Sequence, residues 1–247
     1  MKKDFFSVQA SSYARYRPRY PNELRDFILD HCCNSDLAWD VATGNGQSAA
    51  MLSPHFSEIY ASDISREQLN HAITKPNIHY HLEEAEFCSL PNDSVDLVTV
   101  ATALHWFNRP KFYEQAQRVM KANAFIIAWS YGGCRIDTAI DEIMDEFNFR
   151  YLYAYWHEAA RLNWDDRYAS FDWPFREIDF PSFTATAEYH LDELMNYMFS
   201  WSGVQEYMKR EGKNPLEVVR PLLEKVWGAP DQKRIIRWPL HGKCGYK

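Results

Sequence analysis

Short apolar segments alternate with helical segments between residues 37 and 131, and this alternation limits the fold of the chain more than any other feature. The five predicted strands span residues 37–42, 59–63, 78–82, 95–101 and 125–130. The fourth, Val-Asp-Leu-Val-Thr-Val-Ala, is almost continuously apolar, as a strand buried on both faces should be. Because strands that alternate with helices form parallel sheets covered on both faces, we predict a doubly wound α/β fold with a mostly parallel sheet.

The alternation ends after residue 131, and the rest of the chain is rich in aromatic side chains. Further helices are predicted at 137–170, 191–201 and 214–227, and strands at 177–183 and 234–240. We therefore expect a helical, aromatic-rich cap inserted after strand five and folded over the carboxyl edge of the sheet. The expected division is a core with N-terminal lead-in helices at 1–133, the cap at 134–176, and strands and helices that complete the sheet at 177–247.

The overall charge of the chain is acidic. Lys and Arg number 27 against 34 Asp and Glu, a net charge of -7, so nucleic acid is a poor partner. No stretch approaches the roughly 20 apolar residues that a membrane span needs, and no metal-ligand cluster is evident. The five cysteines have no Cys-x-x-Cys spacing, which suits free thiols in a reducing compartment. We expect a cytoplasmic protein with a small-molecule partner, and the sequence leaves its oligomeric state open.

A glycine-rich turn follows the first predicted strand, with the sequence Asp-Val-Ala-Thr-Gly-Asn-Gly-Gln at 40–47. Glycine has no Cβ, so a ligand can approach the backbone closely. The run from Gly44 to Ala49 also fits the dinucleotide pattern Gly-x-Gly-x-x-Gly/Ala, and the acidic Asp63 lies 19 residues beyond Gly44. The turn is therefore compatible with a dinucleotide oxidoreductase and with an enzyme that uses S-adenosylmethionine.

Two carboxylates favour the second class. A pyrophosphate on the turn would meet the like charge of Asp40 in a partly buried site. The methionine end of S-adenosylmethionine carries an ammonium group beside a sulfonium, so a carboxylate there is favourable. Asp63 ends the second predicted strand, where it can accept both ribose hydroxyls, and Ile64 can lie against the adenine face. A purely structural role for Asp63, as a helix cap, stays open.

Further motifs accompany the turn. They are Tyr-x-x-x-Arg-Pro-x-Tyr-Pro at 13–21, Ala-Glu at 85–86, Leu-Pro-x-x-Ser-Val-Asp-Leu-Val at 90–98, Ala-Leu-His-Trp-Phe at 103–107 and Ala-Trp-x-Tyr-Gly at 128–132. Together they make residues 5–133 resemble the methyltransferase type 11 group of class I S-adenosylmethionine-dependent methyltransferases, closest to its trans-aconitate methyltransferase-like branch. The resemblance implies a Rossmann-like fold, with S-adenosylmethionine as cofactor and S-adenosylhomocysteine as product.

The resemblance also implies roles for residues at matching positions. The glycine turn would hold the methionine part of the cofactor, helped by backbone groups just past the fourth strand. The two residues after the third strand would lie at the adenine edge, and the N-terminal motif would close over the ligand. The implied cofactor-binding residues are Tyr13, Arg17, Asp40, Ala42, Thr43, Gly44, Asn45, Gly46, Gln47, Asp63, Ile64, Ala85, Glu86, Ala101 and Thr102.

Two positions depart from the pattern of the family. Ala42 stands where many relatives have the first glycine of the turn, so we expect its backbone to avoid positive φ. The segment at 120–124 replaces the usual Lys-Pro-Gly-Gly turn before strand five, and Asn123 is expected to take the left-handed conformation.

The catalytic candidates follow the fourth strand, at the sheet edge where ligands bind in such folds. In the family reading His105 and Trp106 face the transferable methyl, and a packing role for both stays open. His105 is the candidate base for a phenol, alcohol or amine acceptor, whereas a carboxylate needs none. The candidates for binding a substrate carboxylate are Arg15, Arg135, Arg150, Arg161 and Arg167.

The resemblance favours a small-molecule methyltransferase, with O-methylation of a carboxylic acid as the expected reaction. Methylation of nitrogen or carbon on another metabolite is the alternative. A non-catalytic cofactor-binding protein, a nucleic-acid methyltransferase and a dinucleotide oxidoreductase also remain open.

Overall fold

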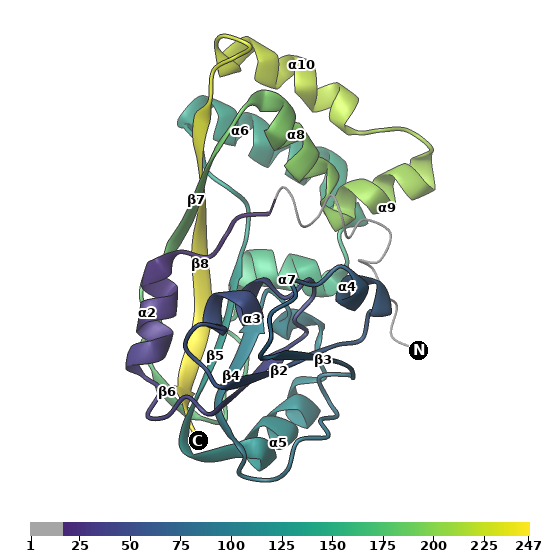
Figure 1. Ribbon diagram of the computed structural model, residues 1–247. Helices are drawn as coiled ribbons and strands as arrows, with labels where there is room; N and C mark the ends of the chain where they lie inside the picture. Colours follow the sequence, from purple (N-terminus) through teal and green to yellow (C-terminus); the bar gives the residue numbers. More distant parts are fainter. Residues whose placement is uncertain (1–16) are drawn as a thin grey trace.

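The chain is organised around a mixed sheet, which the computed structural model describes within residues 17–247 (Figure 1). The strands are β1 (Leu37–Val41), β2 (Glu58–Asp63), β3 (Ile78–Leu82), β4 (Val95–Ala101), β5 (Met120–Tyr131), β6 (Arg176–Ile178), β7 (Thr184–Tyr189) and β8 (Arg234–Tyr246). Their order is β3-β2-β1-β4-β5-β8-β6, and β7 also pairs with β8. The first five strands are parallel, whereas β8 is antiparallel to its neighbours. The predicted doubly wound, mostly parallel α/β fold is confirmed.

Helices cover both faces of the parallel strands. They are α2 (Asn22–Asp30), α3 (Gln47–Leu52), α4 (Arg66–Asn70) and α5 (Arg109–Val119). Ile28 and Leu52 bring α2 and α3 into one buried apolar cluster, and Phe112 brings α5 into a second. Neighbouring residues of β5, such as Ile126 and Ile127, belong to opposite clusters, because successive side chains of a strand point to opposite faces. The sheet is therefore buried between two apolar layers.

A group of helices lies beyond the upper end of β5 in Figure 1. It contains α6 (Thr138–Phe147), α8 (Leu191–Phe199), α9 (Ser202–Glu211) and α10 (Leu216–Trp227), with the short turns η3 (Asn148–Leu152) and η4 (Tyr153–Tyr155). The helix α7 (Glu158–Asp166) lies lower, next to the core, where it packs against β5 and the turn η2 (Leu104–Trp106). α10 packs against both α6 and α8, so helices from 134–176 and from 177–247 share one apolar cluster. β8 connects this group to the core, because its residues 240–246 pair with β5 and its residues 234–239 pair with β7.

The second half of the chain differs from the predicted elements in several places. The single strand expected at 177–183 is wrong: two short strands, β6 and β7, lie on either side of an irregular segment. β8 continues to Tyr246 instead of ending at 240, and β5 begins at Met120. Pairing in the sheet thus extends strands through residues that lack a strong strand pattern, such as the glycines of β8. The helix α9 was not predicted.

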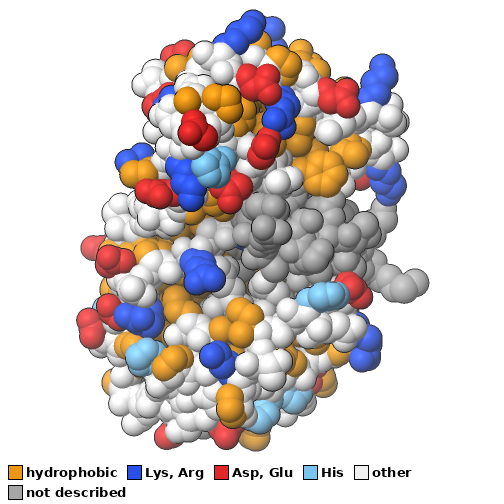
Figure 2. Space-filling view, turned by 45° about the horizontal axis from the view of Figure 1, so that its top comes forward, with side chains coloured by type: hydrophobic (Ala, Val, Ile, Leu, Met, Phe, Trp, Pro, Cys, Tyr) orange, Lys and Arg blue, Asp and Glu red, His pale blue; other side chains and the backbone are white. Residues whose placement is uncertain are grey.

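None of the helices within residues 17–247 has the length and apolarity that a bilayer crossing requires. On the face shown in Figure 2, Lys and Arg side chains are interspersed with Asp and Glu. This face therefore carries no continuous basic patch.

Candidate functional site

The turn between β1 and α3 has a backbone that few residue types adopt readily. Ala42, Gly44 and Gly46 have positive φ, at 53°, 58° and 80°. The amide of Thr43 donates to the carbonyl of Ser62 at 3.0 Å, which holds the turn against the end of β2. The expectation that Ala42 avoids positive φ is therefore wrong. Hydrogen bonds fix the turn, and the alanine is held in it at a cost of about 1–2 kcal/mol.

Asp40 lies beneath this turn and is fully buried. Its Oδ2 accepts from the Thr43 hydroxyl at 2.5 Å and the Ala49 amide at 3.1 Å, and its Oδ1 accepts from the Thr99 hydroxyl at 2.7 Å. Burial raises the pKa of Asp40, and these hydrogen bonds act in the opposite direction. The carboxylate therefore fastens the turn to α3 and β4, and the structure does not bring it to the cavity where a cofactor contact was expected.

Asp63, at the end of β2, is also tied to the turn. Its Oδ2 accepts from the amide of Gly44 and its Oδ1 from the amide of Ser65, both at 2.8 Å. A carboxylate has about four acceptor sites, so this side chain can fix the turn and also accept from a ligand hydroxyl. Ile64 beside it is 43% exposed. The pair offers a polar and an apolar contact side by side.

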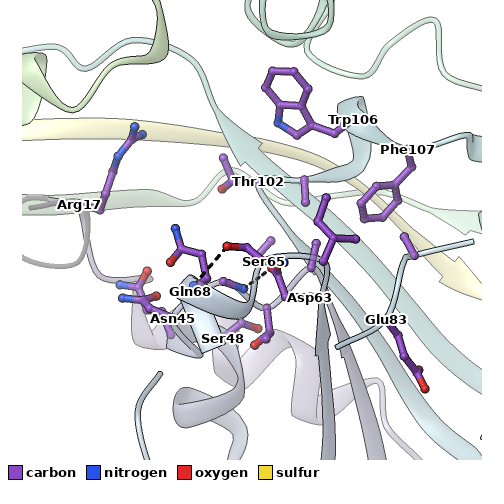
Figure 3. A pocket seen from close by; sticks show the side chains of 18 of the residues that line it. Arg17, Asn45, Ser48, Asp63, Ser65, Gln68, Glu83, Thr102, Trp106 and Phe107 are labelled. Atoms are coloured by element: carbon purple, nitrogen blue, oxygen red, sulfur yellow. Dashed lines mark hydrogen bonds between the residues drawn. The ribbon is translucent and has the colours of Figure 1, made fainter. Parts of the chain in front are cut away.

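A cavity of about 550 Å³, called here the large cavity, opens above the turn. Its volume lies in the range of about 300–1,000 Å³ that suits small-molecule ligands. A Cβ at Gly44 would meet no atom within 4 Å, so a ligand can approach the backbone there. Figure 3 shows Asn45, Ser48 and Gln68 on one side of the large cavity and Trp106 on the other. The predicted residues that line it are Arg17, Ala42, Thr43, Gly44, Asn45, Gln47, Asp63, Ile64, Ala85, Glu86, Ala101, Thr102 and Trp106.

Some predicted site residues lie elsewhere. Tyr13 is outside the described residues, and Asp40, Gly46 and His105 do not line the large cavity. A Cβ at Gly46 would collide with the Tyr80 hydroxyl, so this glycine is needed for packing. The lining residues that were not predicted are Tyr20, Ser48, Ser65, Gln68, Glu83, Ala103, Phe107, Tyr131 and His157. Tyr20, Phe107 and Tyr131 belong to the quoted motifs, whereas His157 comes from the helical region and had no sequence signal.

Arg17 lies between the core and the group of helices. Its Nη1 donates to the Tyr131 hydroxyl at 3.1 Å and its Nη2 to the Ser200 carbonyl at 3.4 Å. The guanidinium also lies over the Tyr197 ring, 5.5 Å from its centroid. These contacts hold one positive charge at the rim of the large cavity.

A second cavity, called here the aromatic cavity, adjoins the large one and has a volume of about 80 Å³. The two cavities share Arg17, Thr102, Trp106 and Tyr131 as lining residues. His105, in the short helical turn η2 (Leu104–Trp106), lines the aromatic cavity. The two cavities are therefore neighbours, which meet at the four residues that line both.

His105 is buried, and its Nδ1 lies 3.1 Å from the Tyr168 hydroxyl. Burial, with smaller contributions from the charges of His241 and His157, lowers the pKa of His105 to about 3. The imidazole is therefore neutral at physiological pH. A neutral group whose conjugate acid is this strong is a poor proton acceptor, so the expected role of His105 as a general base is not supported.

Other predicted charges lie away from both cavities. Arg135 pairs with Asp145 at 2.8 Å, Arg150 pairs with Glu146 at 3.1 Å, and Arg161 lies over an aromatic ring. Neither these nor Arg167 lines either cavity, and Arg15 falls outside the described residues. Within 17–247 no group of three or more His, Cys, Asp or Glu side chains could hold a metal ion.

Comparison with known proteins agrees with this geometry. Residues 39–128 match the family model described as a methyltransferase domain. A provisionally named methyltransferase of Dictyostelium discoideum is 32% identical over 232 residues, which cover 92% of this chain and 88% of that protein. The solved structure of a provisionally named type II methyltransferase from Anaeromyxobacter dehalogenans is 29% identical, with a TM-score of 0.86, and the match covers 94% of this chain and 98% of that one. A mitochondrial arginine hydroxylase of Rattus norvegicus is 28% identical over 116 residues, 45% of this chain and 34% of that protein.

The fold, the glycine turn and these similarities together define a class I S-adenosylmethionine-dependent methyltransferase. The chain belongs to the methyltransferase domain family. S-adenosylmethionine is its methyl donor and S-adenosylhomocysteine its product. The large cavity fits the donor in chemistry, since it combines an approachable glycine backbone, a carboxylate at the end of β2 and an exposed aliphatic side chain.

Proposed function

We propose that this enzyme methylates a carboxylate oxygen of a small molecule, and that the large cavity binds S-adenosylmethionine. In this proposal the turn from Ala42 to Gln47 holds the methionine part, Asp63 accepts from the ribose hydroxyls, and Ile64 contacts the adenine. Ala85 and Glu86 lie at the adenine edge, and Ala101 and Thr102 face the methionine part. Tyr13 and Arg17 close over the cofactor, and Asp40 acts indirectly by fixing the turn.

The observation that carries the acceptor class is the state of His105. Of the described residues that line the aromatic cavity, it alone has a histidine or carboxylate side chain, and its pKa is lowered to about 3. An alcohol or amine acceptor gains from a base whose pKa is near the working pH. A carboxylate is already ionised at neutral pH and needs no base. The guanidinium of Arg17, at the border of both cavities, supplies the complementary charge.

The reaction then balances without a proton. S-adenosylmethionine supplies an activated methyl group, whose bond to sulfur breaks with its electron pair left on sulfur while the carboxylate oxygen forms the new bond to carbon. The products are a methyl ester and S-adenosylhomocysteine. The side chains of the protein align the acceptor with the donor, and such positioning can lower the barrier by several kcal/mol.

Several wider assignments belong to the same proposal. The motifs at 13–21 and 103–107 support membership of the trans-aconitate methyltransferase-like branch. The acidic net charge of -7 supports a small-molecule acceptor over nucleic acid, and the free cysteines suit the cytoplasm. The division at 133 and 176 is retained as a description of sequence segments, although helices of the last two pack together.

The test is methyl transfer from labelled S-adenosylmethionine to a panel of carboxylic acids, alcohols and amines, with mass analysis of the products. Methyl esters that form only from the acids would support the proposal. Transfer to amines or alcohols with carboxylates inert would overturn it in favour of another methyltransferase reaction. Cofactor binding without transfer to any compound of the panel would favour a non-catalytic role.

A further inference from the structure

The two ring nitrogens of His105 have different surroundings. Its Nδ1 lies 3.1 Å from the hydroxyl of Tyr168, and both residues are buried. Its Nε2 makes no hydrogen bond within residues 17–247, yet this nitrogen is not sealed from solvent. Since His105 lines the aromatic cavity and not the large one, Nε2 is the nitrogen that a ligand in the aromatic cavity can reach.

The hydrogen bond between Tyr168 and His105 has a defined direction. Burial raises the pKa of the Tyr168 phenol, and neighbouring donors, which include the backbone amides of Leu104 and His105, act in the opposite direction. The phenol therefore keeps its proton, and its oxygen accepts from these amides. Because the oxygen is occupied as an acceptor, the phenol proton is donated to Nδ1 of the neutral imidazole.

This donation decides the tautomer of His105. A neutral imidazole has one donor and one acceptor nitrogen, and the hydrogen bond made by one nitrogen fixes which of the two carries the proton. With Nδ1 as the acceptor, the ring proton lies on Nε2. His105 therefore presents an N–H donor to the aromatic cavity, and it has no lone pair there with which to accept from an amine or an alcohol.

Other polar groups of the aromatic cavity are already committed to the protein. Asn163 donates from Nδ2 to the Tyr131 carbonyl at 3.4 Å and accepts at Oδ1 from the ring of His241 at 3.0 Å. The indole nitrogen of Trp156 donates to Asn148 Oδ1 at 2.7 Å. The N–H of His105 differs from these groups because it is left for a ligand.

The volume of the aromatic cavity limits what this donor can meet. A space of about 80 Å³ holds only a few groups of the size of a water molecule. A carboxylate group fits, whereas a whole acceptor molecule does not. The rest of an acceptor must lie where the two cavities meet, beside Thr102 and Trp106.

We propose that His105 binds the carboxylate of the methyl acceptor through its Nε2–H, and that Tyr168 is a positioning residue that fixes this tautomer. The inference rests on the proposed function and names a group that recognises its substrate. The N–H donates to one carboxylate oxygen, and the other oxygen attacks the methyl carbon as described above. His105 neither gains nor loses a proton. The same donor selects against an ammonium group, which has no lone pair to accept from it.

Nuclear magnetic resonance of the full-length protein, isotopically labelled at the histidine nitrogens and saturated with S-adenosylhomocysteine, tests the tautomer. Long-range proton–nitrogen correlation spectra show which ring nitrogen carries the proton, and His105→Gln identifies the signals by their loss. We expect a proton on Nε2. A proton on Nδ1 would overturn the inference.

Tyr168→Phe tests the positioning role in the same spectra. Without the phenol we expect a mixture of both tautomers of His105. Tyr113→Phe is the matched control, because the Tyr113 hydroxyl is also buried but has no hydrogen-bond partner in the described part of the chain. It should leave the tautomer unchanged. A single Nε2–H tautomer that persists in Tyr168→Phe would remove Tyr168 from this role.

Paired variants test the contact with the acceptor. The amide of His105→Gln can still place an N–H near the position of Nε2, whereas His105→Leu has a similar volume and no donor. With the most rapidly methylated acid of the panel, we expect kcat/KM to be at least tenfold lower in His105→Leu than in His105→Gln, mainly through KM. An unchanged Kd for S-adenosylhomocysteine shows that both are folded. Equal values of kcat/KM would overturn the contact.

These outcomes separate the inference from the proposed function. Ester formation with a proton on Nε2 and a loss in His105→Leu supports both. Ester formation with a proton on Nδ1, or with equal kcat/KM in the two variants, overturns the inference and leaves carboxylate methylation standing. Absence of ester from every acid of the panel overturns the proposed function, and with it the contact assigned to His105.

Discussion

Asp63 Oδ2 accepts a hydrogen bond from the backbone amide of Gly44 at 2.8 Å, and this contact joins the carboxyl end of β2 to the turn that follows β1. The amide of Thr43 donates to the carbonyl of Ser62 one residue earlier, at 3.0 Å. The carboxylate proposed for the ribose and the backbone proposed for the methionine part are thus one connected unit. A change at either position should affect both contacts.

Replacing Asp63 by alanine should weaken cofactor binding strongly. The variant loses the proposed acceptor for the ribose and releases the amides of Gly44 and Ser65 from their partner. We expect the Kd for S-adenosylhomocysteine to rise at least tenfold, which corresponds to about 1.4 kcal/mol. Titration calorimetry measures this directly. Glu67→Gln, an exposed position on α4, is the control and should bind normally; an unchanged Kd in Asp63→Ala would remove Asp63 from the site.

Asp40→Ala should mainly reduce stability. Asp40 is fully buried and accepts three hydrogen bonds, so its removal leaves the Ala49 amide and the hydroxyls of Thr43 and Thr99 without this acceptor. We expect the free energy of unfolding to fall by about 2–4 kcal/mol. Thr99→Val removes only one of these bonds and should cost about 1 kcal/mol. Urea denaturation followed by circular dichroism compares the two. Equal stability of Asp40→Ala and the parent would show that the turn does not depend on this carboxylate.

The activity of His105→Gln tests whether a base is needed. A neutral imidazole with a pKa near 3 does not titrate between pH 6 and 8.5. We therefore expect kcat/KM for a carboxylate acceptor to be flat over that range, and the variant to keep it within about tenfold. Loss of general base catalysis would instead lower the rate by about 10²–10⁴-fold. A drop of that size, or a rise in rate centred near pH 6.5, would restore His105 as the base.

Acid should destabilise the fold through His105, which is buried, and His241, which is half-buried. Burial is the main cause that lowers the pKa of His105 to about 3 and that of His241 to about 4, from the ordinary histidine value of 6.5. Below pH 6.5 the unfolded chain binds more protons than the folded one. The stability that both groups contribute above pH 6.5 is therefore lost as the pH falls toward 4 and then 3.

The loss of stability in acid can be measured as the slope of the unfolding free energy against pH. Each histidine should contribute about 1.4 kcal/mol per pH unit to the fall in unfolding free energy between pH 6 and pH 4.5. His105→Gln should reduce the slope by that amount, whatever its effect on stability at pH 7. Urea denaturation at several pH values gives both slopes. Identical slopes would mean that His105 binds protons equally in the folded and unfolded states, so that its pKa is not lowered by folding.

Ala42→Gly should stabilise the protein modestly. Ala42 has a φ of 53°, and glycine removes a left-handed strain of about 1–2 kcal/mol but adds unfolded-state entropy worth up to about 1 kcal/mol. We expect a net gain of up to about 1 kcal/mol in the free energy of unfolding. Asn123→Gly, at a φ of 60°, should gain less, because asparagine tolerates this conformation. A loss of stability in Ala42→Gly would show that the alanine methyl packs usefully.

The parallel half of the fold was predictable, because its signals are local. An apolar run such as 95–101 and a glycine turn after a strand follow from sequence alone, and Asn123 does take a positive φ. The prediction that Ala42 avoids positive φ is wrong, because hydrogen bonds between the turn and β2 outweigh the intrinsic preference of alanine for negative φ. The orientation of the Asp40 side chain could not be predicted from the sequence either. Whether this carboxylate points to a ligand or to its own turn depends in part on Thr99, which lies in another strand and donates a hydrogen bond to it.

The helical region was predicted less well, because its elements depend on contacts that are distant in sequence. The aromatic residues at 147–156 do not share one environment: Phe147 is buried, Phe149 and Tyr153 are exposed, and Trp156 lines a cavity. Gly203 and Gly133 decide where two indoles lie, and neither glycine has a recognisable motif.

Tyr131, the last residue of β5, stands opposite Leu240 of β8 in the sheet. The chain leaves the sheet after β5, adds β6 at the edge beside β8, and returns through β8 one strand spacing from β5, about 4.8 Å away. Trp156, Trp164 and Trp201, which line the aromatic cavity, belong to the segment between β5 and β8. The helices of this segment can vary in length while the strands that anchor it, β5, β6 and β8, stay where they are. The same donor-binding half can therefore serve enzymes with unrelated acceptors, and grafting these helices onto the anchoring strands is a direct route to new specificity.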